Sequence, residues 1–255
     1  MSVDSDTAWD IEYGCYTDVG RVRQRNEDAA KVSPDLFLYA VADGMGGHRA
    51  GDRASRIAVQ TLHDFLSDSD DPGAGPEEDT VRAAFMAANR NIIEDASGRP
   101  DRMGMGTTLT ALIVKSGRYL IGHVGDSRAL RVRDGVIEQL TDDHSIVAAQ
   151  VREGGMTEAE AKNHPMRHVL SRCMGCEPDP EVDVLAGEVE DGDLFVLGSD
   201  GLTGALDQEL MAETVISAAD AAAASKDLVE LAHEKDGSDN ITAVVVRCTA
   251  SAAGN

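Results

Sequence analysis

The sequence predicts an α+β fold in which a sandwich of antiparallel sheets is covered by helices. One observation is a dense run of strand-like segments joined by the hairpin signals Ser116-Gly117 and Asp134-Gly135. Another is a pair of long segments, residues 50–66 and 77–96, with apolar residues at helical spacing. The third is length: 255 residues suffice for one domain with a full core, so we expect a single domain over residues 1–255.

The N-terminal half is predicted to contain strands, then two helices, then a run of strands. The first strand is expected at Ile11 to Val19 and the next at Leu36 to Val41. The two helices are separated by residues 67–76, a loop by composition, and would lie antiparallel on one face of a sheet. Four strands follow, at Thr107 to Lys115, Arg118 to Val124, Arg128 to Arg133 and Val136 to Gln139.

The C-terminal half begins with a polar segment, residues 143–185, that interrupts the strand pattern. We interpret it as an inserted flap beside the site, in which Thr157 and Glu160 form a capping box at the start of a short helix. The remaining expected elements are a strand at Asp193 to Leu197, helices at Asp207 to Ser217 and Ala219 to His233, and a closing strand at Asn240 to Cys248.

The charge of the chain excludes several classes of partner. The sequence contains 46 acidic and 23 basic residues, for a net charge of −23. This balance argues against binding to nucleic acid or to an anionic membrane surface. It is typical of a cytoplasm of high ionic strength, where salt screens a dense carboxylate surface. We therefore hypothesise a halophilic source; the alternative is an ordinary acidic protein.

Neither a signal peptide nor a membrane span is indicated. Residues 1–10 are polar and acidic, and no apolar run approaches the roughly 18 residues that span a bilayer. We expect a soluble, cytoplasmic protein.

The four cysteines give little indication of function. Cys173 and Cys176 have the spacing of a zinc or redox pair, but a structural zinc site needs a second such pair, which the sequence lacks. We interpret them as ordinary thiols, with zinc or redox chemistry as the alternative.

Four aspartates lie within two residues of a glycine at the ends of strand-like runs, in the motifs VADGMGG (Asp43), HVGDSR (Asp126), LGSDGL (Asp200) and GSDNIT (Asp239). Each motif alone is most simply a turn, but four of them, together with Asn26-Glu27-Asp28, place many carboxylates at sheet edges. Carboxylates that converge repel one another unless cations lie between them. Hard divalent cations such as Mg²⁺ or Mn²⁺ prefer such oxygen ligands, so the sequence predicts a metal-dependent hydrolase.

Three arginines precede the Asn-Glu-Asp triplet, at Arg21, Arg23 and Arg25. A guanidinium can bind two phosphate oxygens at once, which suggests an anionic substrate. At alternate positions of a strand edge they could equally form a solvated face.

The motifs together resemble the metal-dependent protein phosphatases of type 2C (the PPM family), in their compact bacterial and archaeal form. The resemblance extends from Tyr13 to Val246 and follows the family's order: GRVRQRNEDA, VADGMGGH, GMGTTL, VGDSRAL, LTDDHS, RHVLSRCMG, LGSDGL and GSDNIT. It implies a four-layer α-β-β-α sandwich and the hydrolysis of phosphoserine and phosphothreonine on proteins.

The resemblance also implies the metal ligands. Asp43 is expected to bridge two catalytic cations, Mn²⁺ or Mg²⁺, with the carbonyl oxygen of Gly44 as a further ligand. Asp200 and Asp239 are expected to complete one of the metal sites.

Other roles follow from the same resemblance. Glu27 and Asp28 are expected to hold metal-bound waters, and Asp126 with Asp200 a weaker third metal. Arg23, four residues before Glu27, matches the phosphate-binding arginine.

The implied mechanism is direct attack on phosphorus by a hydroxide that bridges the metals, without a phosphoenzyme. The leaving alkoxide needs a proton, which a histidine of the animal enzymes' DGHGG pattern is proposed to supply. Met45 occupies that position here. His48 is the nearest replacement; it could be the proton donor or only lie near the substrate, and a metal-bound water could serve instead. We interpret His123 and His144 as structural.

The expected partners are phosphorylated proteins, as substrates of a monomer that opposes Ser/Thr kinases in signalling. Two alternatives stay open: a catalytically inactive module that binds phosphoproteins, and a phosphatase of small phosphate esters.

Overall fold

Two antiparallel sheets form the centre of the protein, whose structure is a computed structural model that describes residues 9–45, 50–68 and 77–251. The first sheet contains, in spatial order, β1 (Trp9–Asp18), β11 (Ile241–Ala250), β10 (Leu194–Gly198), β7 (Arg128–Arg133) and β8 (Val136–Gln139). The second contains β2 (Asp28–Ser33), β3 (Leu38–Met45), β5 (Leu109–Lys115), β6 (Arg118–Val124) and β9 (Asp183–Glu188), with the short β4 (Gly106–Thr107) paired to the end of β3.

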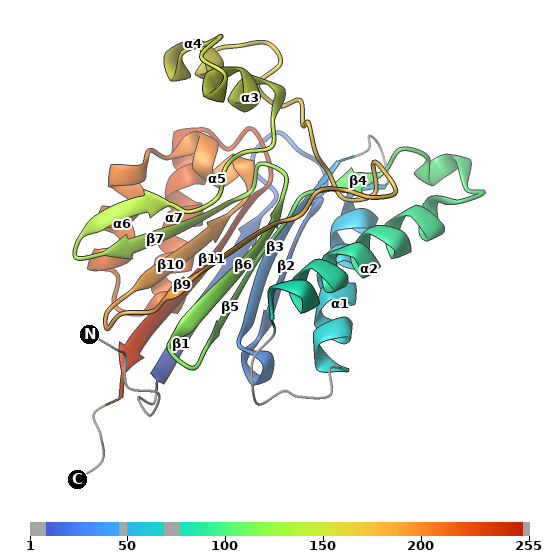
Figure 1. Cartoon of the computed structure of the whole chain (residues 1–255). Coiled ribbons are helices and arrows are strands. Elements are labelled where there is room, and N and C mark those ends of the chain that lie inside the picture. The colour runs from blue at the N-terminus through green and yellow to red at the C-terminus, as the bar shows by residue number, and fades with distance from the viewer. Residues whose placement is uncertain (1–8, 46–49, 69–76, 252–255) are drawn as a thin grey trace.

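Helices cover both outer faces of the sandwich (Figure 1). The helices α1 (Gly51–Ser67) and α2 (Glu78–Ala96) pack on the second sheet, and α5 (Asp200–Ala205), α6 (Gln208–Ser217) and α7 (Ala221–Lys235) on the first. A 3₁₀ turn, η1 (Pro34–Leu36), joins β2 to β3, and another, η2 (Pro100–Arg102), lies between α2 and β4. The expected α-β-β-α arrangement is confirmed.

Alternation along the central strands explains the layering. Because successive side chains of a strand point to opposite faces, Leu38 and Ala40 of β3 pack toward the helices while Tyr39 and Val41 pack toward the other sheet. The strand β11 repeats this pattern on its own side of the molecule. These strands are therefore apolar on both faces, which is why they read as continuous apolar runs in the sequence.

The two hairpin signals are confirmed. Ser116 and Gly117 have φ values of 52° and 71°, and Asp134 and Gly135 have values of 51° and 78°. Positive φ at both central residues is the geometry of the two-residue turn that matches the twist of paired strands.

Several elements differ from the sequence-based expectation. The strand β2 and the helix α5 were not predicted, because the first contains no apolar run and the second begins within the LGSDGL motif. The expected strand from Thr107 to Lys115 is two strands, interrupted at Thr108.

The segment between β8 and β9 contains two short helices, α3 (Ile146–Arg152) and α4 (Glu158–Lys162), at one end of the sandwich (Figure 1). The capping box of Thr157 and Glu160 is confirmed. The strand β9 begins at Asp183, so the last three residues of the expected flap, 183–185, belong to the second sheet instead. They were missed because β9 is an edge strand without an apolar run.

Cys173 and Cys176 form a disulfide bond, so the interpretation as ordinary thiols was wrong. Their Cα atoms are 5.6 Å apart, which lies within the range of disulfides. The backbone of Met174, between them, pairs with Thr107 of β4.

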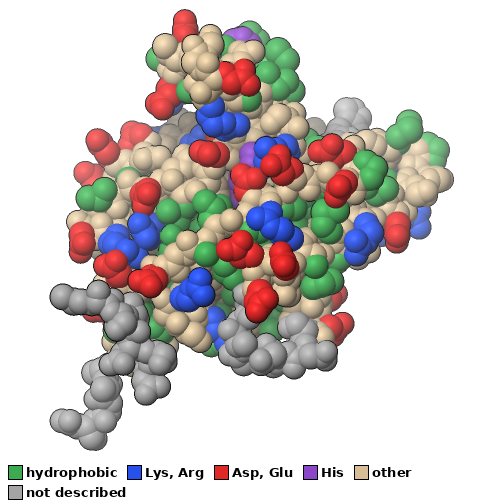
Figure 2. All heavy atoms as spheres, in the orientation of Figure 1, with side chains coloured by type: hydrophobic (Ala, Val, Ile, Leu, Met, Phe, Trp, Pro, Cys, Tyr) green, Lys and Arg blue, Asp and Glu red, His purple; other side chains and the backbone are tan. Residues whose placement is uncertain are grey.

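Acidic side chains are scattered over the face seen in Figure 2, with fewer basic ones among them. Within the residues that the structure describes, no helix is both long and apolar enough to cross a membrane.

Candidate functional site

Two of the carboxylates are brought together by strand register. Asp28, the first residue of β2, is the direct partner of Asp43 in β3. Directly opposed residues of an antiparallel pair project to the same face of the sheet. The backbone of Asp43 is fixed on its other side, because its N–H donates to Thr108 Oγ1 at 2.8 Å and its carbonyl accepts from Thr107 Oγ1 at 2.8 Å. The two threonines of the GMGTTL motif thus set the position of Asp43.

Asp200 and Asp239 come from neighbouring strands of the other sheet. Asp200 follows the end of β10 and Asp239 precedes the start of β11, and these strands are antiparallel partners. The end of one therefore lies beside the start of the other. Asp126 lies in the short connection between β6 and β7, and the first residue of β7 pairs with Gly198 of β10. All of these aspartates lie at the same end of the sandwich.

Asn240 joins the loop that bears Glu27 to the strand that follows Asp239. Its side-chain oxygen accepts from the N–H of Glu27 at 2.8 Å, and its side-chain nitrogen donates to the carbonyls of Val19 and Arg25, both at 2.9 Å. One buried amide therefore holds both ends of the loop that precedes β2. This places Glu27 next to the cluster of aspartates.

The end of β3 requires two glycines. A Cβ at Gly44 would lie 2.1 Å from the carbonyl oxygen of Gly51, and a Cβ at Gly51 would lie 2.7 Å from the carbonyl oxygen of Gly44. Neither distance is possible between real atoms, so only glycine permits α1 to start against this strand. The close approach brings the Gly44 carbonyl to the same region as Glu27, whose Oε2 would be 2.9 Å from a Cβ at Gly51.

Burial and mutual repulsion raise the pKa of several of these groups. Burial, then the charges of Asp28 and Asp200, raise the pKa of Asp43 well above its usual range. Burial and neighbouring carboxylates, among them Asp200, likewise raise the pKa of Asp28 and that of Asp126 to about 7. Burial also opposes ionisation of Asp200, but hydrogen bonds from His168 and from Asp43 outweigh it and lower the Asp200 pKa.

The donor set fits divalent cations with oxygen ligands. Carboxylates that share one end of the sandwich need a positive charge between them to ionise together. Asp28 Oδ1 is buried without a hydrogen-bond partner, while Oδ2 accepts from Thr242 at 2.6 Å, so one oxygen is left for a further ligand. In the described parts of the chain, no three acidic, His or Cys side chains already stand at distances suited to one ion.

One of the three arginines faces the cluster. Arg23 Nη2 lies 2.7 Å from Asp239 Oδ2, and the side chain is 52% exposed. Partial burial would lower the pKa of Arg23, but the bond to Asp239 and the charges of Asp200 and Asp43 raise it. Arg21 instead donates to the carbonyl of Glu234, and Arg25 lines a separate pocket. Arg23 is thus a cation with an exposed edge beside the carboxylates, where a phosphate could bind.

His168 belongs to the site and was not singled out from the sequence. Its Nδ1 lies 3.4 Å from Asp200 Oδ2. This contact raises the pKa of His168, and partial burial, which would lower the pKa, has the smaller effect. The RHVLSRCMG motif contains this histidine, so the signal was present. His48, the expected proton donor, lies outside the described residues.

His123 and His144, which were interpreted as structural, make contacts within the fold. His123 is buried on β6 and neutral, because burial and then His144 lower its pKa to about 4. Its Nε2 donates to the carbonyl of Asp142 at 3.0 Å, and its Nδ1 faces Thr110 Oγ1. His144 Nδ1 accepts from the N–H of Gly125, which fixes the turn before Asp126.

An ion pair lies at the start of β7, two residues after Asp126. Arg128 forms a two-point contact with Asp143, with distances of 2.8 and 2.7 Å. The motif LTDDHS, in which Asp143 lies, is thereby held against the start of β7.

The chain is similar in sequence to proteins named serine/threonine phosphatases. The chain is 37% identical over 234 residues to "Serine/threonine phosphatase stp" of Listeria monocytogenes, which covers 90% of this chain and 93% of that protein. It is 38% identical over 236 residues to "Serine/threonine protein phosphatase PstP" of Mycobacterium tuberculosis, covering 92% of this chain and 44% of that longer protein.

Solved structures share the fold. The crystal structure of the Mycobacterium tuberculosis serine/threonine phosphatase PstP/Ppp superposes with a TM-score of 0.85 at 37% identity, over 93% of this chain and 98% of that one. A structure of the PstP catalytic domain in complex with two manganese ions has a TM-score of 0.84 at 34% identity, over 95% and 100% of the two chains. The family model described as Protein phosphatase 2C matches residues 20–234, and the chain belongs to that family.

Proposed function

We propose that the protein hydrolyses phosphoserine and phosphothreonine esters of proteins with the help of divalent cations. The observation that carries the proposal is the convergence of Asp28 and Asp43 from one sheet with Asp200 and Asp239 from the other, beside Arg23. Relatives named serine/threonine phosphatases support the substrate class.

Mn²⁺ or Mg²⁺ is the proposed cofactor, with two or three ions per chain. The two manganese ions of the related PstP catalytic domain support the choice. The proposed ligands are Asp43, the Gly44 carbonyl, Asp200 and Asp239, with Glu27 and Asp28 acting through waters and Asp126 with Asp200 at a third ion. When bound, the cations would supply an activated water and offset charge on the phosphoryl oxygens.

The side chains of this protein would then orient the reactants. Arg23 would bind two oxygens of the phosphoryl group with its guanidinium, which Asp239 holds in place. Its fixed positive charge would stabilise negative charge that develops on those oxygens in the transition state. His168, next to Asp200, and His48 are the candidate donors of a proton to the leaving alkoxide.

We further propose that the substrates are the products of Ser/Thr kinases and that the protein acts in signalling as a cytoplasmic monomer. The relatives' names support the link to phosphorylated proteins. A halophilic cytoplasm is proposed from the net charge of −23, because a surface of such charge repels itself unless salt screens it.

One experiment tests the catalytic proposal and its salt dependence. Phosphate release from a phosphothreonine peptide would be measured with Mn²⁺ or Mg²⁺, at low and high KCl, with EDTA as the control. Release that needs the metal is expected, and it should increase with KCl. A folded protein that binds metal but releases no phosphate at any salt would favour the inactive binding module. Turnover of p-nitrophenyl phosphate but not of the peptide would indicate a phosphatase of small esters.

A further inference from the structure

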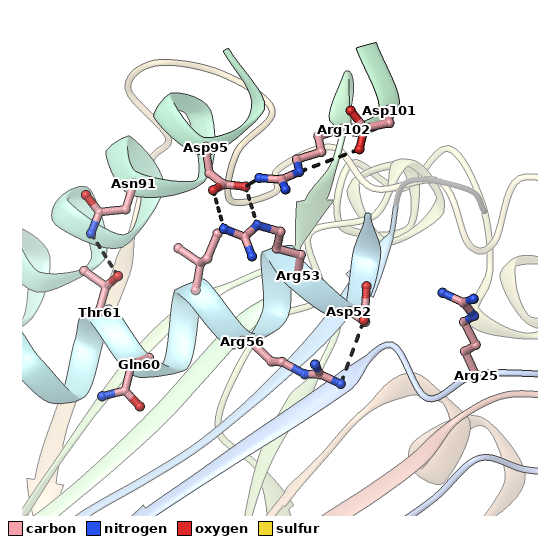
Figure 3. A pocket seen from close by; sticks show the side chains of 11 residues that line it. Arg25, Asp52, Arg53, Arg56, Gln60, Thr61, Asn91, Asp95, Asp101 and Arg102 are labelled. Atoms are coloured by element: carbon pink, nitrogen blue, oxygen red, sulfur yellow. Dashed lines mark hydrogen bonds and ion pairs between the residues drawn. The ribbon is translucent and has the colours of Figure 1, made fainter. Parts of the chain in front are cut away.

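A polar pocket, separate from the carboxylate cluster, lies between α1, α2 and the turn η2 (Figure 3). Its volume is about 720 Å³. The lining residues are polar except for Ile57, and four of them are arginines: Arg25, Arg53, Arg56 and Arg102. None of the lining residues belongs to the proposed metal ligands, so the pocket is a separate feature of the molecule.

The pocket is basic in an otherwise strongly acidic protein. Its lining holds four arginines and three aspartates, while the whole chain has a net charge of −23. One carboxylate, Asp95, accepts from Arg53, Arg102 and also Arg99, and Asp101 lies 3.8 Å from Arg102, so two negative charges face three positive ones. The cluster around Asp95 therefore keeps an excess of positive charge.

Two of the lining arginines are available to a ligand. Among the residues that the structure describes, Arg56 forms an ion pair only with Asp52, at 3.8 Å, and its side chain is 70% exposed. The exposed side chain of Arg25 makes no ion pair or hydrogen bond within the described part of the chain. The pocket wall on the side away from Arg25 is also polar, since Asn91 of α2 donates to Thr61 of α1 at 3.0 Å and Gln60 lies near them (Figure 3).

The pocket adjoins the proposed catalytic centre. Arg25 is two residues from Glu27, and its carbonyl is held by Asn240, which also binds the Glu27 N–H. On the other side, Asp52 follows Gly51, whose backbone packs against Gly44. A peptide bound with one residue at the metal ligands can therefore reach the pocket with another, since an extended chain spans about 3.3 Å per residue.

We propose that this pocket binds a second anionic group, a phosphate or a carboxylate, of the peptide whose phosphorylated residue lies at the carboxylate cluster. The inference rests on the proposed protein phosphatase function and adds a substrate class to it: segments with a further phosphoresidue or an acidic residue near the reacting one. Guanidinium groups bind such oxygens in pairs. A local excess of positive charge would also offset the repulsion that the acidic surface exerts on such peptides.

The test compares peptides with a single phosphothreonine and neutral flanks against peptides with a second phosphate or a glutamate two, three or four residues to either side. The value of kcat/KM would be measured for the wild type, Arg56→Ala, Arg56→Glu and Arg56→Lys. Arg90→Ala is the matched control, since Arg90 is an exposed arginine of α2 that does not line the pocket. Hydrolysis of p-nitrophenyl phosphate reports the basal activity.

The wild type is expected to prefer at least one doubly anionic peptide by about threefold to tenfold, as an exposed charge-assisted contact allows. Arg56→Ala should abolish the preference, Arg56→Glu should reverse it, and Arg56→Lys should restore part of it. Arg90→Ala should keep it, and all variants should hydrolyse the small ester at the wild-type rate. No preference at any spacing, or a preference that survives Arg56→Glu, would overturn the proposal.

Two further measurements distinguish a substrate pocket from an effector pocket. Peptide binding in EDTA, followed by fluorescence anisotropy, gives the same ratios without turnover, so the pocket is tested even if the proposed hydrolysis fails. Inorganic phosphate is then titrated into the small-ester assay. A change of rate that depends on Arg56 would mean that the pocket binds free phosphate as an effector, and this would overturn its assignment to the substrate.

Discussion

Asp28 of β2 lies directly opposite Asp43 of β3, and the pKa of each is raised by burial and by surrounding carboxylates. Two opposed carboxylates destabilise a strand pair, because like charges face each other across it. The fold nevertheless fixes both: Thr242 donates to Asp28, and Thr108 accepts from the Asp43 N–H. The strand pair therefore holds two carboxyl groups that cannot both ionise easily, and a bound cation would favour their ionisation.

Replacing Asp43 with Asn is expected to abolish metal-dependent turnover and, in EDTA, to raise the melting temperature. The amide keeps the size of the side chain and leaves the backbone bonds to Thr107 and Thr108 in place. It removes an ionisable group whose charge is disfavoured by burial and neighbouring carboxylates, and also the ligand that is proposed to bridge two ions. Thermal unfolding with and without Mn²⁺ measures both effects. A variant that Mn²⁺ stabilises as strongly as the wild type would contradict the proposed role.

Replacing Arg23 with Ala is expected to raise KM for phosphopeptides by about tenfold, with a smaller change in kcat, because a phosphate contact is lost. Arg21→Ala is the matched control, since Arg21 contacts the carbonyl of Glu234 and not the cluster. Steady-state kinetics on one phosphothreonine peptide measure the difference. An equal effect of the two substitutions would argue that charge in this segment matters without a specific contact.

Replacing Thr108 with Val is expected to lower both stability and turnover. The substitution removes the acceptor of the Asp43 N–H and the partner of Ser127 Oγ. Leaving such buried groups unpaired costs about 1–3 kcal/mol. Thr108→Ser keeps the hydroxyl and should retain most of both properties. Urea unfolding and kcat are the measurements, and the prediction fails if Thr108→Ser is as damaging as Thr108→Val.

In EDTA, the protein is expected to become more stable as the pH falls from 7.5 to 5.5. The folded-state pKa values of Asp28 and Asp126, about 7, lie above the ordinary value of 3.8, so protonation favours the folded state. The stability linked to them is fully present below pH 3.8 and is lost as the pH rises through about 7.

The titration of His123 has the opposite effect on the pH dependence of stability. Its folded-state pKa of about 4 lies below the ordinary value of 6.5, so its contribution is lost as the pH falls from 6.5 to 4. The two carboxyl groups together change the free energy of unfolding more than the one imidazole does. The expected net effect is therefore a gain of stability toward pH 5.5. Urea unfolding in EDTA at pH 7.5, 6.5 and 5.5 measures it, and saturating Mn²⁺ should remove the gain. A steady decrease of stability toward pH 5.5 in EDTA would disprove the prediction.

The sequence predicts local structure well wherever one short segment determines it. The strands Arg118–Val124 and Arg128–Arg133 were predicted with their observed bounds, because apolar alternation and the turns that follow are local signals. The edge strand β9 lacks such a signal and was missed. Strand register is not a local property either. The sequence from residue 28 to residue 43 contains no signal that Asp28 pairs directly with Asp43.

The same distinction applies to the candidate site. The aspartates could be found because each lies in its own glycine-containing motif, and the structure places them at one end of the sandwich. The contact of His168 with Asp200 depends on how the segment between β8 and β9 folds back. The basic pocket depends on the packing of α1 against α2, and the bond between Cys173 and Cys176 on a loop held by β4. None of these follows from spacing alone.

The site joins the two sheets, since Asp28 and Asp43 belong to one and Asp200 and Asp239 flank strands of the other. An ion shared among them would act as a cross-link between the halves of the sandwich, and its affinity would depend on how well the sheets stay docked. The apolar layer between the sheets contains Phe195 and Val244, which are not ligands. A cavity made there should first appear as weaker metal binding, before any loss of secondary structure. The affinity for the metal would thus report how well the two sheets pack against each other.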